Sequence, residues 1–141
     1  MKNILIINGH PNPASYNFAL TESYKNGALE AKANVETIVI ADLKFNPNLA
    51  YGYQKRIDLE PDLAEAWEKL TKADHLVWIH PVWWGGLPAI TKGFIDRLFL
   101  PGMAFQYREN SVWWNKLLKG KTAHIITTLD QPRWYYFLFS S

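Results

Sequence analysis

The sequence contains no cysteine among its 141 residues. This absence excludes disulfide bonds, thiolate nucleophiles, iron–sulfur clusters and cysteine-based zinc sites. Any redox chemistry carried out by this chain must therefore depend on a bound cofactor.

Long apolar runs and a strong excess of one charge are also missing. The first apolar run, residues 4–7, is too short for a signal peptide, and no stretch approaches the roughly 20 apolar residues of a membrane span. The formal net charge is only +2, with Lys and Arg scattered along the chain, which argues against binding to nucleic acid or to a membrane surface. We therefore expect a cytoplasmic protein that binds small molecules.

Several familiar catalytic signatures do not occur. There is no G-x-G-x-x-G or Walker A sequence, which disfavours a Rossmann dinucleotide site and a nucleoside triphosphatase, and nothing resembles a nucleophile elbow. His75, His80 and His124 have no partner at metal-ligand spacing, so we interpret them as structural and expect no metal site. Asp96 and Arg97 are interpreted as part of a solvated helix face.

Strand and helix patterns alternate along the chain, and its length and composition, 48% hydrophobic and 20% charged, indicate one globular domain over residues 1–141. Such alternation predicts an α/β three-layer sandwich with parallel strands and right-handed crossovers. Predicted strands cover residues 4–7, 35–40, 76–79 and 122–128, and predicted helices cover 16–31, a segment beginning at 61, and 89–99.

The first and third predicted strands are the most apolar, so both should lie at the centre of the sheet. This matches a flavodoxin-like order, here 2-1-3-4, with a fifth strand expected to be missing because the sequence stops soon after the fourth. Ligands bind such sheets at the carboxyl edge, at the switch point between strands one and three. The long connections 42–60 and 101–120 are expected to be functional or mobile.

Residues 9–17 connect the first strand to the first helix and are suited to a phosphate group. Backbone N–H groups at a helix N-terminus form an anion site, to which His10, Ser15 and Asn17 can add side-chain donors. An alternative is that Ser15 merely caps the helix while the prolines shape an ordinary turn. The residues alone leave both interpretations open.

The turn that follows the third strand suits a flat ligand. Trp83 and Trp84 offer apolar indoles, and the two glycines after them allow the backbone to approach a planar ring closely. We expect one indole to pack and Trp83 to lie along the ring. Thr127 and Thr128 end the fourth strand at the same edge, where they can bond the polar rim of a ring.

Taken together, these segments resemble the flavodoxin-like NAD(P)H:quinone oxidoreductases over nearly the whole chain. The resemblance rests on Gly9-His10-Pro11 with Ser15-Tyr16-Asn17, on Pro81-Val82-Trp83-Trp84-Gly85 leading into Pro88-Ala89-Ile90 and Lys92-Gly93-Phe94, and on Thr127-Thr128. It implies an FMN or FAD cofactor, NADPH or NADH as co-substrate, and two-electron hydride transfer through flavin N5 to a quinone or similar acceptor. The resemblance also implies a homodimer.

The same resemblance implies roles for individual residues. The phosphate would be held by His10, Ser15, Tyr16 and Asn17, and the ring would be contacted by Pro81, Val82, Trp83, Trp84, Gly85, Thr127 and Thr128. Tyr135 or Tyr136 is a candidate for one further hydroxyl, and Tyr136 is the one side chain considered for a catalytic role. The chain departs from many members of this family in having Leu129-Asp130, rather than two glycines, after the paired threonines.

Two other functions fit the same sequence. Because the family includes channel-associated members, the chain is alternatively a flavin-binding regulatory or partner-binding module with little or no turnover. An electron-carrying flavodoxin is less favoured, because flavodoxins tend to be acidic and this chain is slightly basic.

Overall fold

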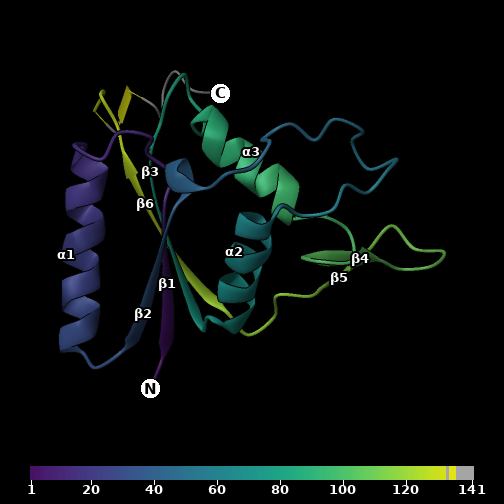
Figure 1. Cartoon of the computed structure of the whole chain (residues 1–141), viewed down its shortest axis with the longest axis horizontal. Helices are drawn as coiled ribbons and strands as arrows, with labels where there is room; N and C mark the ends of the chain where they lie inside the picture. Colours follow the sequence, from purple (N-terminus) through teal and green to yellow (C-terminus); the bar gives the residue numbers. More distant parts are fainter. Residues whose placement is uncertain (133, 136–141) are drawn as a thin grey trace.

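Four parallel strands form the central sheet in the order β2-β1-β3-β6, and helices cover both of its faces (Figure 1). The computed structural model describes residues 1–132 and 134–135. Its elements are β1 (Asn3–Asn8), α1 (Tyr16–Glu30), β2 (Asn34–Val39), the 3-10 helix η1 (Ile40–Asp42), α2 (Pro61–Lys72), β3 (His75–Pro81), α3 (Ala89–Leu98), β4 (Phe105–Tyr107), β5 (Trp114–Lys116) and β6 (Thr122–Thr128). The predicted α/β sandwich and its flavodoxin-like strand order are confirmed.

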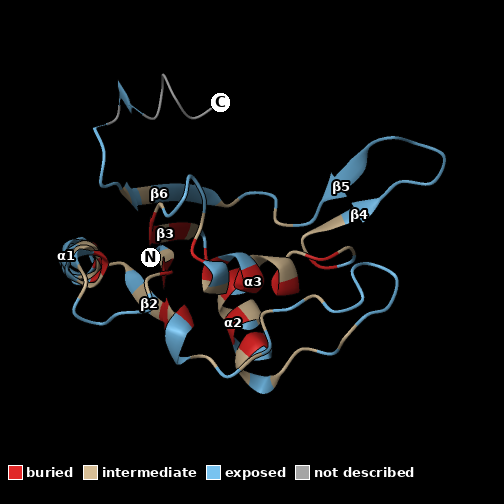
Figure 2. Cartoon of the chain, turned by 90° about the horizontal axis from the view of Figure 1, so that it is seen from above, coloured by how far each residue is buried: buried red, intermediate tan, exposed pale blue. Residues whose placement is uncertain are grey.

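Alternating side chains of the strands build a core on each side of the sheet. Leu5 and Ile7 of β1 pack with α2 and α3, whereas Ile6 lies on the opposite face with Val77 and Ile79, beneath α1. Viewed from above, the buried residues concentrate on β1, β3 and the inner faces of the helices (Figure 2). The central strands are apolar on both faces because helices cover both sides.

Strand β6 forms the outer edge of the described sheet. It pairs with β3 along its whole length, but most of its side chains are exposed, and Ile125 retains 64% of its surface. Within the described residues the sheet ends at this strand. The prediction that a fifth strand is missing stays a prediction.

The connection 101–120 contains a β-hairpin that the sequence pattern did not predict. Its strands β4 and β5 have three residues each and pair in antiparallel register, which is too short for a clear period-2 signal. The hairpin projects away from the sandwich (Figure 1) and exposes Tyr107, Val112, Trp113 and Trp114.

The interpretation of Arg97 as part of a solvated face is wrong. Only 1% of Arg97 is exposed, and its guanidinium donates to both carboxylate oxygens of Glu60, at 3.0 and 2.8 Å. It also donates to the backbone oxygens of Asn46 and Asp58. The long connection 43–60 is therefore held against α3, while Asp96 does pair with Lys92 on the exposed side of the helix.

Gly93 of α3 allows the same connection to approach the helix. A Cβ at this position would lie 2.4 Å from Pro47 Cβ and 2.8 Å from the Pro47 backbone oxygen. Gly93→Ala is therefore expected to lower the free energy of unfolding by about 1–3 kcal/mol. Gly27 of α1 has nothing within 4 Å of its added Cβ, so Gly27→Ala is expected to raise stability by about 0.5 kcal/mol. Urea denaturation followed by circular dichroism measures both, and equal effects at the two glycines would contradict this account.

Candidate functional site

The carboxyl ends of β1, β3 and β6 meet at one edge of the sheet and bring the predicted segments together. The Gly9 N–H, just after β1, donates to the Ile79 oxygen of β3 at 2.8 Å. The Val82 N–H, just after β3, donates to the Thr128 oxygen of β6 at 2.9 Å. The loop of residues 9–17, which is predicted to hold a phosphate and which we call the phosphate loop, is thereby fixed beside the turn of residues 82–86, which we call the tryptophan turn.

The phosphate loop is held by hydrogen bonds to its own side chains and to Asn8, the last residue of β1. Asn8 Oδ1 accepts from the His10 N–H at 2.8 Å, and Asn12 Oδ1 accepts from the Ala14 N–H at 2.9 Å. The Asn12 N–H donates to His10 Nδ1 at 3.0 Å. Because Nδ1 accepts this bond, the neutral His10 ring carries its hydrogen on Nε2, which can donate to a ligand.

Ser15 occupies the N-cap position of α1, yet its hydroxyl does not cap the helix. An ordinary N-cap side chain accepts from an N–H in the first turn, whereas Ser15 Oγ is buried and has no hydrogen-bond partner in the described structure. The first turn of α1 carries no acidic residue, so nothing offsets the positive end of the helix dipole. A buried hydroxyl without a partner at such a helix end is suited to an anion, and the interpretation of Ser15 as a simple cap loses its support.

Asn17, which is predicted to contact the phosphate, is bonded to Thr128, which is predicted to contact the ring. Asn17 is 3% exposed, and its Nδ2 donates to Thr128 Oγ1 at 3.0 Å. This bond ties the first turn of α1 to the end of β6. Thr127, next to Thr128, lies exposed on the other face of the strand, and Tyr16 is 70% exposed at the helix start.

The tryptophan turn is a tight reversal closed by two hydrogen bonds between Trp83 and Gly86, each 3.0 Å long. Its central residues, Trp84 and Gly85, have φ of 51° and 73°, as in the type I′ turn. A positive φ is unusual for a bulky residue, and the Trp84 indole is fully exposed. Trp83 is 43% exposed and makes an edge contact with His10 at 5.5 Å between ring centroids. Neither indole packs in the core of this chain, and packing of one of them at a subunit interface stays a prediction.

A cleft of ≈ 580 Å³ lies between this turn and the segment after β6. This volume falls within the range of about 300–1,000 Å³ that is usual for small-molecule sites. Its lining residues are Val82, Trp83, Trp84, Gly85, Asp130, Gln131 and Tyr135. Asp130 therefore faces the cleft at the position where the chain departs from many family members. Tyr136, the side chain considered for catalysis, lies outside the described residues.

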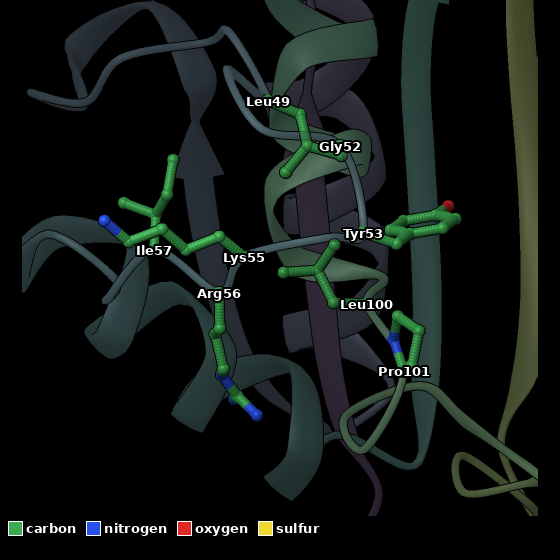
Figure 3. Close-up of a pocket in the computed structure, with 8 residues that line it drawn as sticks. All are labelled: Leu49, Gly52, Tyr53, Lys55, Arg56, Ile57, Leu100 and Pro101. Carbon is green, nitrogen blue, oxygen red and sulfur yellow. The ribbon is translucent and has the colours of Figure 1, made fainter.

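A second hollow lies on the other side of α3, where the connection 49–57 meets Leu100 and Pro101 (Figure 3). It measures only ≈ 90 Å³, which is too small for a planar ring system of several fused rings. Of these two hollows, only the cleft at the tryptophan turn is large enough for such a ligand.

The remaining histidines have structural surroundings. His75 bonds Thr122 at 2.7 Å and Tyr24 at 3.3 Å, and its pKa is lowered by burial and by the nearby charges of His124 and Lys2. His80 Nδ1 lies 2.9 Å from the Pro81 oxygen. No group of three metal-ligating side chains is found among the described residues. In the same part of the chain, no helix is long and apolar enough to cross a membrane.

The fold is an α/β sandwich of flavodoxin-like type, with a cleft at the carboxyl edge of its sheet. The sequence matches the Flavodoxin_2 family, described as having a flavodoxin-like fold, over residues 2–138. The chain therefore belongs to the flavodoxin-like family that includes the NAD(P)H:quinone oxidoreductases.

Individual relatives agree with this assignment. An uncharacterized NAD(P)H oxidoreductase from Haemophilus influenzae is 30% identical over 108 residues, covering 74% of this chain and 54% of the relative. NAD(P)H dehydrogenase [quinone] 1 from Cavia porcellus is 28% identical, covering 76% of this chain and 46% of the relative. The crystal structure of Smu.1420 from Streptococcus mutans superposes with a TM-score of 0.81 at 33% identity, covering 96% of this chain and 72% of that one. The chain thus spans about half the length of these two curated relatives.

Proposed function

We propose that this protein binds a flavin, FMN or FAD, and uses it to transfer two electrons from NADPH or NADH to a quinone or similar small acceptor. The observation that carries the proposal is the buried hydroxyl of Ser15, which has no hydrogen-bond partner among the described residues and lies at the N-terminus of α1, at the sheet edge that also carries the cleft of the tryptophan turn. Relatives named as NAD(P)H oxidoreductase and quinone dehydrogenase support the reaction class.

The residues of the site fit both ends of a flavin. At the phosphate loop, Ser15 Oγ, the His10 Nε2–H and the N–H groups of the first turn of α1 would hold the phosphate. At the tryptophan turn, Trp83 and the backbone of residues 82–85 would form an apolar wall for the ring. When bound, the flavin would supply the hydride chemistry that a chain without cysteine does not provide itself.

The charges around the cleft bear on which groups would bind the flavin ring. The Asn17–Thr128 pair fixes the end of β6 beside the cleft, while the Asp130 carboxylate lines it. A carboxylate at this place disfavours additional negative charge nearby. We therefore propose that ring binding depends on the wall formed by Trp83 and on backbone donors rather than on side chains after β6.

The exposed aromatic residues of the β4–β5 hairpin support a homodimer, because clustered apolar side chains on a surface mark interfaces.

The test is flavin binding followed by reduction. Addition of FMN or FAD to the purified protein should quench flavin fluorescence with saturation, and anaerobic mixing with NADPH or NADH should bleach the flavin absorbance. A quinone should then restore the colour. Absence of saturable binding would contradict the proposal, whereas tight binding with no bleaching by either nucleotide would favour the regulatory or partner-binding module.

A further inference from the structure

We propose that Thr21, a buried residue of α1 that cannot touch a ligand, is a positioning residue for the phosphate loop. It would act through Asn8 to fix the His10 backbone in the orientation that the anion site needs. The inference rests on the proposed flavin-binding function and goes further, because it assigns a role to two residues outside the predicted site.

Two buried polar side chains and one backbone oxygen form a continuous chain of hydrogen bonds behind the loop. Asn8 Nδ2 donates to Thr21 Oγ1 at 2.9 Å, and Thr21 Oγ1 donates in turn to the Asn17 backbone oxygen at 2.9 Å. Asn8, Thr21 and Asn17 are 0%, 1% and 3% exposed. Since both bonds are shielded from water, losing one partner leaves a buried polar group unsatisfied.

The chain reaches both halves of the site. On one side, Asn8 Oδ1 accepts from the His10 N–H at 2.8 Å, at the entrance of the phosphate loop. On the other, Asn17 Nδ2 donates to Thr128 Oγ1 at 3.0 Å, and the Thr128 oxygen accepts from Val82 at the tryptophan turn. Thr21 bonds the Asn8 side chain on the first side but only the Asn17 backbone on the second. Its loss therefore affects the orientation of the Asn8 amide and leaves the Asn17–Thr128 bond in place.

The orientation of Asn8 matters because an amide presents different groups on its two sides. With its Nδ2 held by Thr21, its oxygen faces the His10 N–H. Without an acceptor at position 21, only the bond from the His10 N–H still holds the Asn8 amide, and its buried Nδ2 is left without this partner. The Asn8 side chain can then rotate away, and the His10 backbone is held less firmly, although no ligand-contacting atom has been changed.

The experiment compares Thr21→Val, which keeps the shape and removes the hydroxyl, with Thr21→Ser, which keeps the hydroxyl. Affinities for FMN and for riboflavin are measured by fluorescence quenching, since only FMN carries the phosphate. Thr21→Val should weaken FMN binding about tenfold and leave riboflavin binding unchanged, while Thr21→Ser should remain within about twofold of the wild type. Thr71→Val, which removes a hydroxyl bonded to Glu68 on the exposed side of α2, is the matched control and should change neither affinity.

Equal loss of FMN and riboflavin affinity in Thr21→Val, or no loss of either, would overturn the inference. If Thr21→Val does not fold, Thr21→Cys takes its place, because a thiol of similar size is a weaker hydrogen-bonding group. If the wild-type protein binds neither flavin, the proposed function fails, and amide hydrogen exchange at His10 in the ligand-free protein decides the inference separately. Faster exchange at His10 in Thr21→Val but not in Thr21→Ser would support it, and equal exchange rates would overturn it.

Discussion

Arg97→Ala is expected to lower the free energy of unfolding by about 3–5 kcal/mol, because removing one partner of a buried ion pair leaves its other partners uncompensated. The Arg97 side chain is 1% exposed. Its guanidinium donates hydrogen bonds to the Glu60 carboxylate and to the backbone oxygens of Asn46 and Asp58. Because the Glu60 side chain is 30% exposed, water can rescue part of its charge, which places the effect near the lower limit. Urea denaturation at neutral pH measures it.

Lys92→Ala provides the matched control on the same helix. Lys92 pairs with Asp96 one turn along α3, but both side chains are at least 36% exposed. Exposed pairs at this spacing contribute about 0.3–0.5 kcal/mol, so Lys92→Ala should hardly shift the denaturation midpoint. A similar loss in both variants would show that the buried position of Arg97 is not what matters.

The pH dependence of stability offers a second readout for this ion pair. Burial raises the pKa of Glu60, but the hydrogen bonds from Arg97 and from the Asn46 N–H outweigh it, so the pKa lies below its ordinary value. A lowered carboxyl pKa contributes stability above the pKa of the unfolded state, and this contribution is lost as the pH falls toward the folded pKa. Arg97→Ala should therefore lose less stability on acidification than the wild type does.

Local sequence patterns were enough to predict the sheet but not its long-range polar contacts. The apolar runs of β1 and β3 predict that these two strands lie at the centre of the sheet, because apolarity on both faces indicates burial. The full order 2-1-3-4 follows from the flavodoxin-like pattern that this placement matches. Arg97 was misjudged because its partner, Glu60, is 37 residues away and nothing in the helix pattern distinguishes it from Asp96. The proline and polar residues of 43–60 gave no signal that this connection lies against a helix.

The sequence indicates which segments meet at the candidate site, but it does not indicate the residues that support them. Ser15 and Trp83 stood out because their neighbours form a strand-to-helix loop and a glycine turn. Thr21 and Asn8 did not, since a threonine within a helical pattern and an asparagine ending a strand are both common. The positive φ of Trp84 was also beyond local prediction, because the Trp83–Gly86 bonds that impose it are known only from the folded backbone.

Ser15→Ala is expected to separate stability from ligand affinity. Replacing an ordinary N-cap serine by alanine costs about 1 kcal/mol, but here the hydroxyl makes no cap bond and is buried without a partner. The ligand-free variant should therefore be at least as stable as the wild type. Its affinity for FMN should fall by roughly 10- to 100-fold, the value of about 1.5–3 kcal/mol for a hydrogen bond to a charged group.

Riboflavin and Ser23 supply the controls for this prediction. Riboflavin lacks the phosphate, so its affinity should be the same for the wild type and for Ser15→Ala. Ser23 lies exposed on α1, two turns beyond Ser15, and Ser23→Ala should leave FMN affinity unchanged. Fluorescence titration and thermal unfolding measure the two properties on the same samples. If Ser15→Ala is less stable than the wild type and still binds FMN normally, Ser15 is a helix cap. Its hydroxyl would then stabilise the ligand-free protein and contribute nothing to FMN binding.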